Sequence, residues 1–312
     1  MKFQPLDRRA HPLGAVFSSW TAADGWTLRR MEWRQEQGTP ARGSILFANG
    51  RGDFIEKYLE ALGHWHACGW NVASFDWRGQ GDSRGQIVGG HLDSFDPLIG
   101  DADTLVREWL TSTPAPHVLM GHSMGGHLML RLVAERKPKV DALVLIAPMI
   151  GINASPVPSG LSRLIARTLC MLGLRNRPAW KHNERPAMAH VSRARFLTSC
   201  PDRYEDELWW KRQRPGFDLG PPSWGWLDAA FRSIARVTPA LLRRVETPVL
   251  LLGTDRDRLV SPAAMRQAAE ILPNSTLFMF PTAAHEILRE NDAVRLEALA
   301  QIDRFLDEHA KA

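Results

Sequence analysis

One serine in this sequence stands in a setting that could make it a nucleophile. Residues 121–126 read GHSMGG, so Ser123 is the centre of a G-x-S-x-G pattern. The apolar run 118–120 before it is strand-like, and residues 124–135 after it have helical character. The pattern needs this strand–turn–helix context, because small residues two before and two after the serine let strand and helix pass closely. We therefore predict that Ser123 is a catalytic nucleophile.

A serine hydroxyl needs a base to take its proton and an acid to orient that base. His285 lies between the expected last strand, 276–280, and the final helix, 293–309, which is a suitable place for the base. The acid should follow the apolar strand 248–253, where both Asp255 and Asp257 occur. The strand 142–147 ends without an acid, so one of these two aspartates is expected to hold His285.

Negative charge that develops on the substrate oxygen would need two backbone donors. The N–H of Met124, directly after the nucleophile, is the first candidate. The second is expected from the glycine-rich loop 49–52, which reads NGRG after the strand 44–49, and we assign it to the N–H of Arg51.

The elements that must position these residues alternate along the chain. A hairpin is expected over 16–33, followed by strands at 44–49, 71–76, 118–121 and 142–147 with helices at 54–68, 96–110 and 124–135 between them. This alternation predicts an α/β fold with a mostly parallel sheet, flanked by helices on both faces. Ligands of such sheets bind at the carboxyl ends of the strands.

The alternation stops after residue 151. Residues 152–236 contain many prolines, arginines and tryptophans but no clear strands, and strand signals return at 248–253. We expect residues 1–151 and 237–312 to form one core, with 152–236 inserted as a mainly helical cap.

With these residues in place, the chain resembles the lysophospholipase and monoacylglycerol lipase branch of the α/β hydrolases. The likeness is strongest to bacterial lysophospholipases, which are often grouped with serine aminopeptidases. It implies the α/β-hydrolase fold and, since the family acid precedes an Arg-x-Val-like run, it implies Asp257 as the acid. Monoacylglycerol lipases usually begin the oxyanion loop with His-Gly, whereas this chain has Asn-Gly. The segments that carry the likeness are 49–58, 76–83, 121–126, 197–199, 224–227, 257–260 and 285–288.

The resemblance implies a serine hydrolase that cleaves a carboxylic ester of a single-chain lipid through an acyl-serine intermediate. A short-chain carboxylesterase, an amidase or aminopeptidase, and an acyltransferase could use the same triad. A non-catalytic binding protein on a hydrolase scaffold is a more distant alternative, because such proteins commonly lack a triad member. The twelve tryptophans could line an apolar cleft or pack in the core.

Charge is distributed unevenly along the chain. The net charge is +5, and residues 152–236 carry 14 Lys or Arg against 7 Asp or Glu. This asymmetry indicates an anionic partner for the cap, such as a lipid phosphate or an anionic membrane surface touched peripherally, with a basic surface that is merely solvated as an equal alternative. Nucleic acid is not expected, because the basic residues are scattered among prolines and no binding motif occurs.

No metal or other cofactor is expected. His64 and His66 are two residues apart in an expected helix, so their side chains do not face each other. The chain has no H-E-x-x-H or C-x-x-C spacing, and 121–126 lacks the G-x-G-x-x-G of dinucleotide-binding proteins.

The remaining signals concern location. The first residues, 1–9, contain no apolar segment typical of a signal peptide, and no apolar run reaches the ~20 residues of a membrane span. Three widely spaced cysteines argue against a disulfide framework. We therefore expect a cytoplasmic protein, with peripheral contact at the inner face of the membrane.

Overall fold

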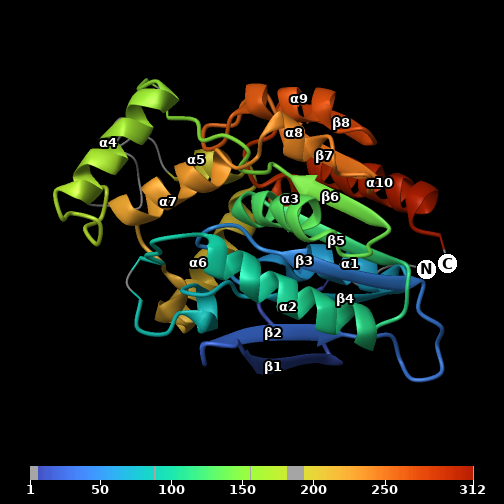
Figure 1. Cartoon of the computed structure of the whole chain (residues 1–312). Helices are drawn as coiled ribbons and strands as arrows, with labels where there is room; N and C mark the ends of the chain where they lie inside the picture. The colour runs from blue at the N-terminus through green and yellow to red at the C-terminus, as the bar shows by residue number, and fades with distance from the viewer. Residues whose placement is uncertain (1–5, 88, 155, 181–192, 312) are drawn as a thin grey trace.

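A single eight-stranded sheet forms the centre of the molecule (Figure 1). The computed structural model describes residues 6–87, 89–154, 156–180 and 193–311. The strand order is β1-β2-β4-β3-β5-β6-β7-β8; β1 pairs with β2 and β2 with β4 antiparallel, and all other pairs are parallel. The strands are β1 (Ala15–Thr21), β2 (Thr27–Trp33), β3 (Gly43–Ala48), β4 (Trp70–Phe75), β5 (His117–His122), β6 (Ala142–Ile146), β7 (Val249–Thr254) and β8 (Ser275–Phe280).

Helices cover both faces of this sheet, which confirms the predicted fold class. On one face α1 (Leu59–Ala67) lies beside α10 (Asp292–His309), and a hydrogen bond from His64 to Asp303 joins the two helices. On the other face α2 (Asp96–Ser112) packs on α3 (Met124–Arg136), followed by α8 (Pro239–Leu242) and α9 (Pro262–Ile271).

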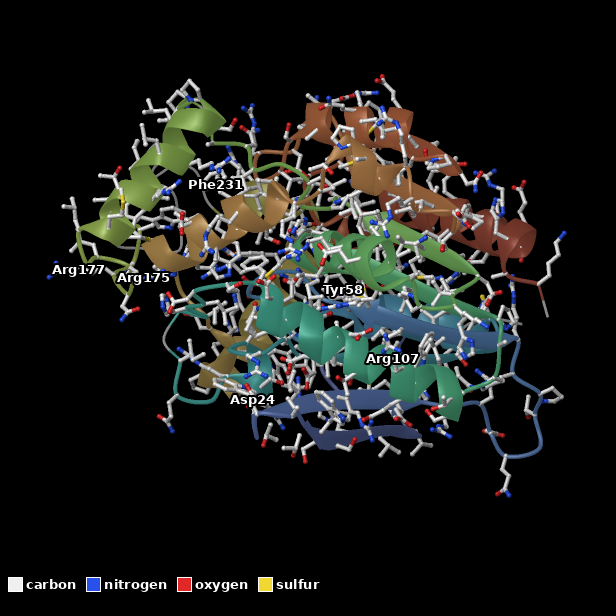
Figure 2. All side chains as sticks on the ribbon, in the orientation of Figure 1. Asp24, Tyr58, Arg107, Arg175, Arg177 and Phe231 are labelled. Atoms are coloured by element: carbon white, nitrogen blue, oxygen red, sulfur yellow. The ribbon has the colours of Figure 1, made fainter. Side chains whose placement is uncertain are left out.

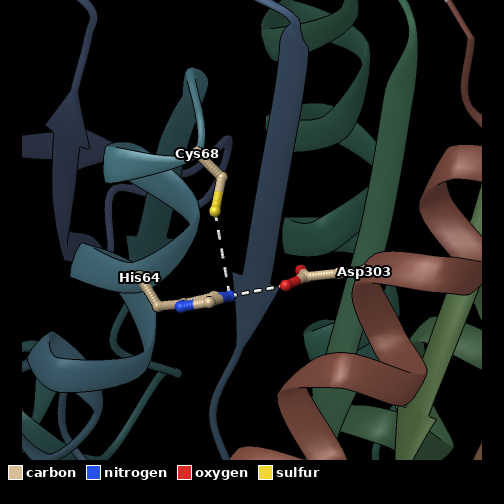
Figure 3. A group of neighbouring side chains, drawn as sticks. All are labelled: His64, Cys68 and Asp303. Atoms are coloured by element: carbon tan, nitrogen blue, oxygen red, sulfur yellow. Dashed lines mark hydrogen bonds and ion pairs between the residues drawn. The ribbon is translucent and has the colours of Figure 1, made fainter. Parts of the chain in front are cut away.

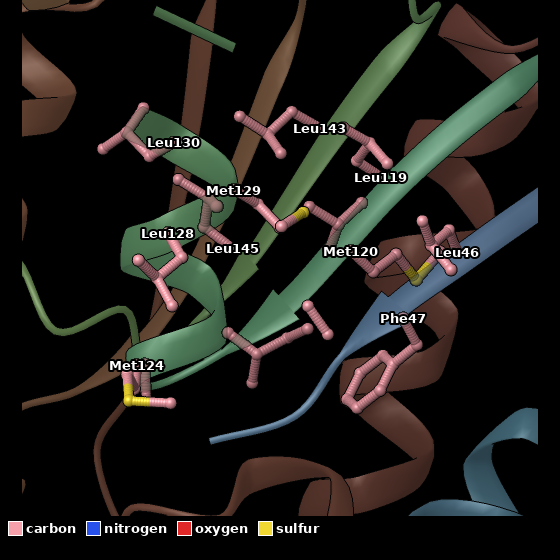
Figure 4. Close-up of a cluster of buried hydrophobic side chains, with 14 of the residues drawn as sticks. Leu46, Phe47, Leu119, Met120, Met124, Leu128, Met129, Leu130, Leu143 and Leu145 are labelled. Atoms are coloured by element: carbon pink, nitrogen blue, oxygen red, sulfur yellow. The ribbon is translucent and has the colours of Figure 1, made fainter. Parts of the chain in front are cut away.

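The central strands are apolar because they are buried on both faces. Every residue of β3, β5, β6 and β7 is buried. Figure 4 shows Leu119 and Leu143 of the sheet on the side where Met129 of α3 lies. This packing fixes α3 against the end of β5, where the predicted nucleophile lies.

Most predicted elements occur close to their expected ranges, and the hairpin over 16–33 is confirmed by the antiparallel pairing of β1 with β2. Two details differ. The helix expected at 54–68 begins as a 3-10 turn, η1 (Ile55–Tyr58), before α1 continues it. The helix α9 was not expected, although Ser261 caps its start and Pro262 stands in its first turn, as in many helices.

Between β6 and β7 the described residues form helices joined by turns and loops, and no strand occurs among them. These helices include α4 (Ser159–Met171), α5 (Ala194–Leu197), α6 (Pro201–Gln213) and α7 (Trp224–Ile234). In Figure 1, α4 and α7 lie side by side at one end of the molecule. Residues 155 and 181–192 of the predicted cap lie outside the described residues, and the division at 152–236 stays a prediction.

The structure bears on only part of what the sequence predicts about a signal peptide and membrane-spanning segments. Residues 1–5 of the N-terminal segment lie outside the described residues. Within the described part of the chain, none of the helices combines the length and the apolar character needed to cross a bilayer.

Candidate active site

Ser123 occupies the sharp turn between β5 and α3. Its backbone has φ 52° and ψ −116°, a conformation that non-glycine residues seldom adopt. Surrounding hydrogen bonds hold it: the Ser123 N–H donates to Ile146 O (2.9 Å), and its carbonyl accepts from His127 N–H (3.0 Å) and Met149 N–H (2.9 Å). A strained residue held by its neighbours at the carboxyl end of a parallel strand is typical of a functional site.

Glycines on either side of the serine allow this turn. A Cβ on Gly121 would lie 2.7 Å from the backbone of Gly125, and one on Gly125 would lie 2.2 Å from Ala48 O and 2.4 Å from Asn49 O. Because glycine has no side chain, the first turn of α3 can lie directly against the loop that follows β3. Met124, whose N–H is the first proposed donor, is the first residue of this helix.

That loop presents one backbone donor that the protein does not use. The N–H of Gly50 donates to Asp53 Oδ2 (2.9 Å) and the N–H of Gly52 donates to Gln80 Oε1 (2.5 Å). Among the described residues, the N–H of Arg51 between them has no acceptor. Arg51 lies in the lining of the same pocket as Ser123, so its N–H is suited to stabilise an oxyanion.

His285 follows β8 and is held by Asp257, which follows β7. His285 Nδ1 lies 2.7 Å from Asp257 Oδ2, and both side chains are buried. The other carboxylate oxygen of Asp257 accepts from the N–H groups of Leu259 (2.8 Å) and Val260 (2.9 Å). With both oxygens occupied, the carboxylate is fixed in one orientation toward the imidazole.

The second candidate acid is placed elsewhere. Asp255 is exposed and forms a salt bridge with Arg266 at 2.7 Å. The two aspartates that the sequence left open thus have different environments, and Asp257 is the one that contacts His285.

Electrostatics in the pair favour the charged forms. Burial alone would lower the pKa of His285, but the negative charge of Asp257 and its hydrogen bond raise it above the ordinary value. Burial alone would raise the pKa of Asp257, whereas the charge of His285 and the hydrogen bonds lower it. The acid therefore remains ionised while the imidazole gains basicity, as a general base requires.

Ser123 and His285 line one pocket, but no hydrogen bond closes between their side chains in the described structure. Catalytic hydrogen bonds are often long in the absence of substrate and tighten on binding. The structure thus joins two of the three predicted triad residues directly and places the third beside them.

The pocket above Ser123 is largely apolar and lies between the sheet edge and the helical segment 152–236. Of the tryptophans, Trp180 and Trp226 contribute to its lining, whereas Trp65, Trp70 and Trp77 are fully buried in the core. Both uses of tryptophan considered from the sequence therefore occur. The other apolar lining residues are Met149, Ile152, Phe196, Leu197, Pro222, Leu227, Leu259 and Val260.

A buried ionic network under the pocket was not foreseen from the sequence. Lys57 Nζ lies 2.6 Å from Asp53, 2.6 Å from Glu286 and 2.9 Å from Glu207. Arg289 forms salt bridges with Glu207 (3.0 Å) and Glu286. The network ties α6 to the loop of His285, because Glu286 is the next residue along the chain. Its local signals are acid–base pairs at helical spacing, 53 with 57, 207 with 211 and 286 with 289, which do not indicate that the three pairs meet.

A second cluster lies away from the pocket, between α1 and α10 (Figure 3). His64 Nε2 lies 2.7 Å from Asp303 Oδ2 and 3.9 Å from Cys68 Sγ. The three residues offer ligand atoms within 4.8 Å of one another, and His66, the histidine near His64 in sequence, is not among them. Burial, and then the charge of Asp303, raise the pKa of the Cys68 thiol. None of the three lines the pocket of Ser123.

Comparisons with known proteins agree with this geometry. The chain is 28% identical over 270 residues to the probable lysophospholipase L2 of Haemophilus influenzae, covering 85% of this chain and 84% of the relative. It is 23% identical over 288 residues to the monoacylglycerol lipase of Mycolicibacterium smegmatis, covering 91% and 92%. A soluble variant of the monoglyceride lipase of Saccharomyces cerevisiae has a TM-score of 0.75 at 18% identity, covering 98% and 99%.

The last of these comparisons shows that the fold is that of the α/β hydrolases. The family model described as serine aminopeptidase, S33 matches residues 39–292, from just before β3 to the first residue of α10. This match takes in most of the chain, and the chain therefore belongs to the serine aminopeptidase, S33 family of serine hydrolases.

Proposed function

We propose that this protein hydrolyses carboxylic esters of single-chain lipids, lysophospholipids or monoacylglycerols, through an acyl-serine intermediate. The observation that carries the proposal is that His285, held by Asp257, lines the same apolar pocket as the strained Ser123. The relatives named lysophospholipase and monoacylglycerol lipase support the lipid class.

In the proposed reaction, Ser123 Oγ attacks the ester carbonyl while His285 Nε2 takes the hydroxyl proton. Asp257 keeps the imidazole oriented and stabilises its charged form. The N–H groups of Arg51 and Met124 bind the oxyanion of the tetrahedral intermediate. His285 then protonates the leaving alcohol, and water attacks the acyl-serine by the same steps in reverse. No cofactor takes part in these steps.

The substrate reaches this site, in our proposal, from an anionic membrane surface that the protein contacts through α4. Ala166 of α4 is buried, while a stripe along the helix and just beyond it is exposed. The exposed residues are Leu161, Leu164, Ile165, Met171 and Leu172. Helical spacing places them on one face.

Basic side chains accompany this apolar stripe, which we name the α4 stripe. Arg163 and Arg167 are exposed on α4 and have no acidic partner among the described residues. Arg175 and Arg177 lie at the outer end of the same segment, beyond α4 (Figure 2). Exposed apolar residues flanked by arginines suit the interface of an anionic bilayer. The proposal thus assigns the excess of basic residues in 152–236 to contact with lipid and not with nucleic acid.

We further propose that the protein acts in the cytoplasm, at the inner face of the membrane. Cys68, Cys170 and Cys200 are free thiols, which suits a reducing compartment.

The test is hydrolysis of a matched panel by the wild-type protein and by Ser123→Ala. The panel contains p-nitrophenyl esters of increasing chain length, monoacylglycerol, lysophosphatidylcholine and an aminoacyl anilide. We expect the two lipids to turn over fastest, and Ser123→Ala to lose activity on every substrate. Turnover of short esters or of the anilide alone would reject the lipid assignment. Failure of a fluorophosphonate to label Ser123 would reject the catalytic assignment itself.

A further inference from the structure

The side chain of Arg51 extends from the oxyanion loop into the lining of the active-site pocket. Its Nη2 donates to the carbonyl oxygens of Gly89 (2.9 Å) and Gly220 (3.2 Å), and its guanidinium lies 4.9 Å from the ring centre of Trp226. These contacts hold the guanidinium in one position beside Ser123. Its Nε is buried without an acceptor, and its Nη1 has none among the described residues.

No carboxylate in the described structure neutralises this cation. The two acidic side chains in the lining of the pocket, Asp53 and Glu286, are both engaged with Lys57 at 2.6 Å. Asp257, next to the pocket, is engaged with His285. The pocket therefore carries positive charge that its own acids do not balance.

Holding such a charge costs free energy unless an anion offsets it. Burial, and then the positive charge of Arg193, lower the pKa of the Arg51 guanidinium to about 9. Arg193 also lines the pocket, so the positive charges of two arginines act on each other there. A bound anion would relieve both effects, and guanidinium groups bind phosphate oxygens by strong, charge-assisted hydrogen bonds.

We propose that Arg51 binds the phosphate of a phosphate-bearing single-chain lipid and is the residue by which this enzyme prefers such a lipid to a neutral monoacylglycerol. The inference rests on the proposed function, and it states which of the two proposed lipid classes the enzyme prefers. The backbone N–H of Arg51 serves the oxyanion in both classes, whereas its side chain serves only the anionic one.

A purely structural use of Arg51 would be to tie the core to the loop that precedes α7. Arg84 provides a comparison, because its Nη1 also donates to carbonyl oxygens of the segment before α7, those of Gly216 (3.0 Å) and Asp218 (3.2 Å), as Arg51 donates to that of Gly220. Arg84 does not line the pocket. A tether therefore predicts similar effects of the two arginines, and phosphate binding predicts different ones.

The experiment compares the wild-type protein, Arg51→Met and Arg84→Met on lysophosphatidylglycerol and on monoacylglycerol with the same short acyl chain, below their micelle concentrations. The readout is the ratio of kcat/KM for the two lipids. Damage to the oxyanion loop enters both values and cancels in the ratio. We expect the ratio to fall about 30-fold in Arg51→Met, mainly through KM for the anionic lipid, as for loss of a charged hydrogen bond. Arg84→Met should leave the ratio unchanged.

A ratio that stays within threefold of wild type in Arg51→Met, or falls equally in Arg84→Met, would overturn the proposal. Inhibition by inorganic phosphate distinguishes a site for free phosphate from one for the lipid head group; we expect the lipid to bind far more tightly. If wild type hydrolyses neither lipid, the proposed function fails. Binding of the non-hydrolysable ether analogues, followed by tryptophan fluorescence, then still tests whether Arg51→Met selectively weakens the phosphate-bearing one.

Discussion

Asp257 determines both the orientation and the proton affinity of His285. The aspartate is fixed by two backbone N–H groups on one oxygen and by the imidazole on the other. In a buried pocket an isolated histidine would be less basic than in water. The raised pKa of His285 therefore depends on the charge of Asp257, with smaller contributions from Glu286 and Asp53.

This dependence predicts the pH profile of the enzyme. His285 accepts a proton only when it is neutral, so kcat/KM rises with pH through the pKa of His285, above the free-histidine value of about 6.5. In Asp257→Asn the attraction is lost while burial remains, so the acid limb should move to lower pH. We also expect kcat to fall by roughly 10⁴-fold, because the imidazole loses its orientation. The pH dependence of kcat/KM on a soluble ester measures both effects.

Asp255→Asn is the control for this prediction. Asp255 is exposed, pairs with Arg266 and stands two residues from Asp257 on the same loop. Its substitution should leave the acid limb in place. An acid limb that moves equally in both variants would mean that the loop, and not the contact with His285, sets the proton affinity.

The helix α3 and the oxyanion loop form a second unit of function, since each supplies one proposed donor. Their approach depends on Gly125, whose Cβ would lie 2.2 Å from Ala48 O. Gly125→Ala must therefore push the helix away from the loop. We expect a loss of about 1–3 kcal/mol in the free energy of unfolding, together with a loss of kcat as the donors separate. Urea unfolding and fluorophosphonate labelling rates are the measurements.

Gly100→Ala is the matched control, because Gly100 is an exposed residue of α2 with no atom within 4 Å of an added Cβ. There the substitution should stabilise the protein by about 0.5–1 kcal/mol, the usual gain of alanine in a helix. If both variants unfolded alike, close packing at Gly125 would not be the reason for a glycine there.

The network around Lys57 joins η1, α6 and the loop of His285. Its central ammonium is buried and faces three carboxylates. Lys57→Met would leave these carboxylates without their shared cation, so we expect a loss of about 3–5 kcal/mol in the free energy of unfolding. Lys211→Met removes only the partner at the edge of the network, at Glu207, and should cost less than half as much. Equal unfolding midpoints in urea would contradict this account.

These elements also show what the sequence could predict. The strands and helices before residue 151 follow from apolar runs separated by turn residues, and Ser123 and His285 follow from their places in that order. The residues alone could not separate Asp255 from Asp257, because both follow β7 and only the three-dimensional course of the loop decides which one meets His285.

Contacts between distant segments escaped prediction for the same reason. The partners of Lys57 include Glu207 and Glu286, which are far away in sequence and have no pattern linking them to it. Whether a carboxylate pairs with the Arg51 guanidinium likewise depends on the fold, which pairs the nearby Asp53 with Lys57. Charge composition indicated an anionic partner, but it could not indicate which arginine would meet it.

At the scale of the whole molecule, five of the eight exposed large apolar side chains among the described residues lie on α4 or directly after it. The α4 stripe lies on the helix that packs on α7, and α7 in turn contributes Trp226 to the pocket. An amphiphile that entered the surface layer of a bilayer beside α4 would thus lie close to the pocket of Ser123. Contact with the membrane and access of substrate to the pocket would then both depend on the same segment, residues 152–236.

This arrangement predicts that the α4 stripe controls binding to membranes. Leu164→Ser combined with Ile165→Ser should weaken partition onto anionic vesicles by roughly tenfold or more, because two apolar side chains no longer leave water. Leu296→Ser, at a leucine of α10 that is 57% exposed, is the control and should bind like wild type. Raising salt from 50 to 500 mM should weaken binding further in every variant, since Arg163 and Arg167 remain. Vesicle co-sedimentation measures these changes, with thermal unfolding as the check on folding. Equal loss in the Leu296 variant would mean that any exposed leucine contributes, and the stripe would lose its role as the membrane contact.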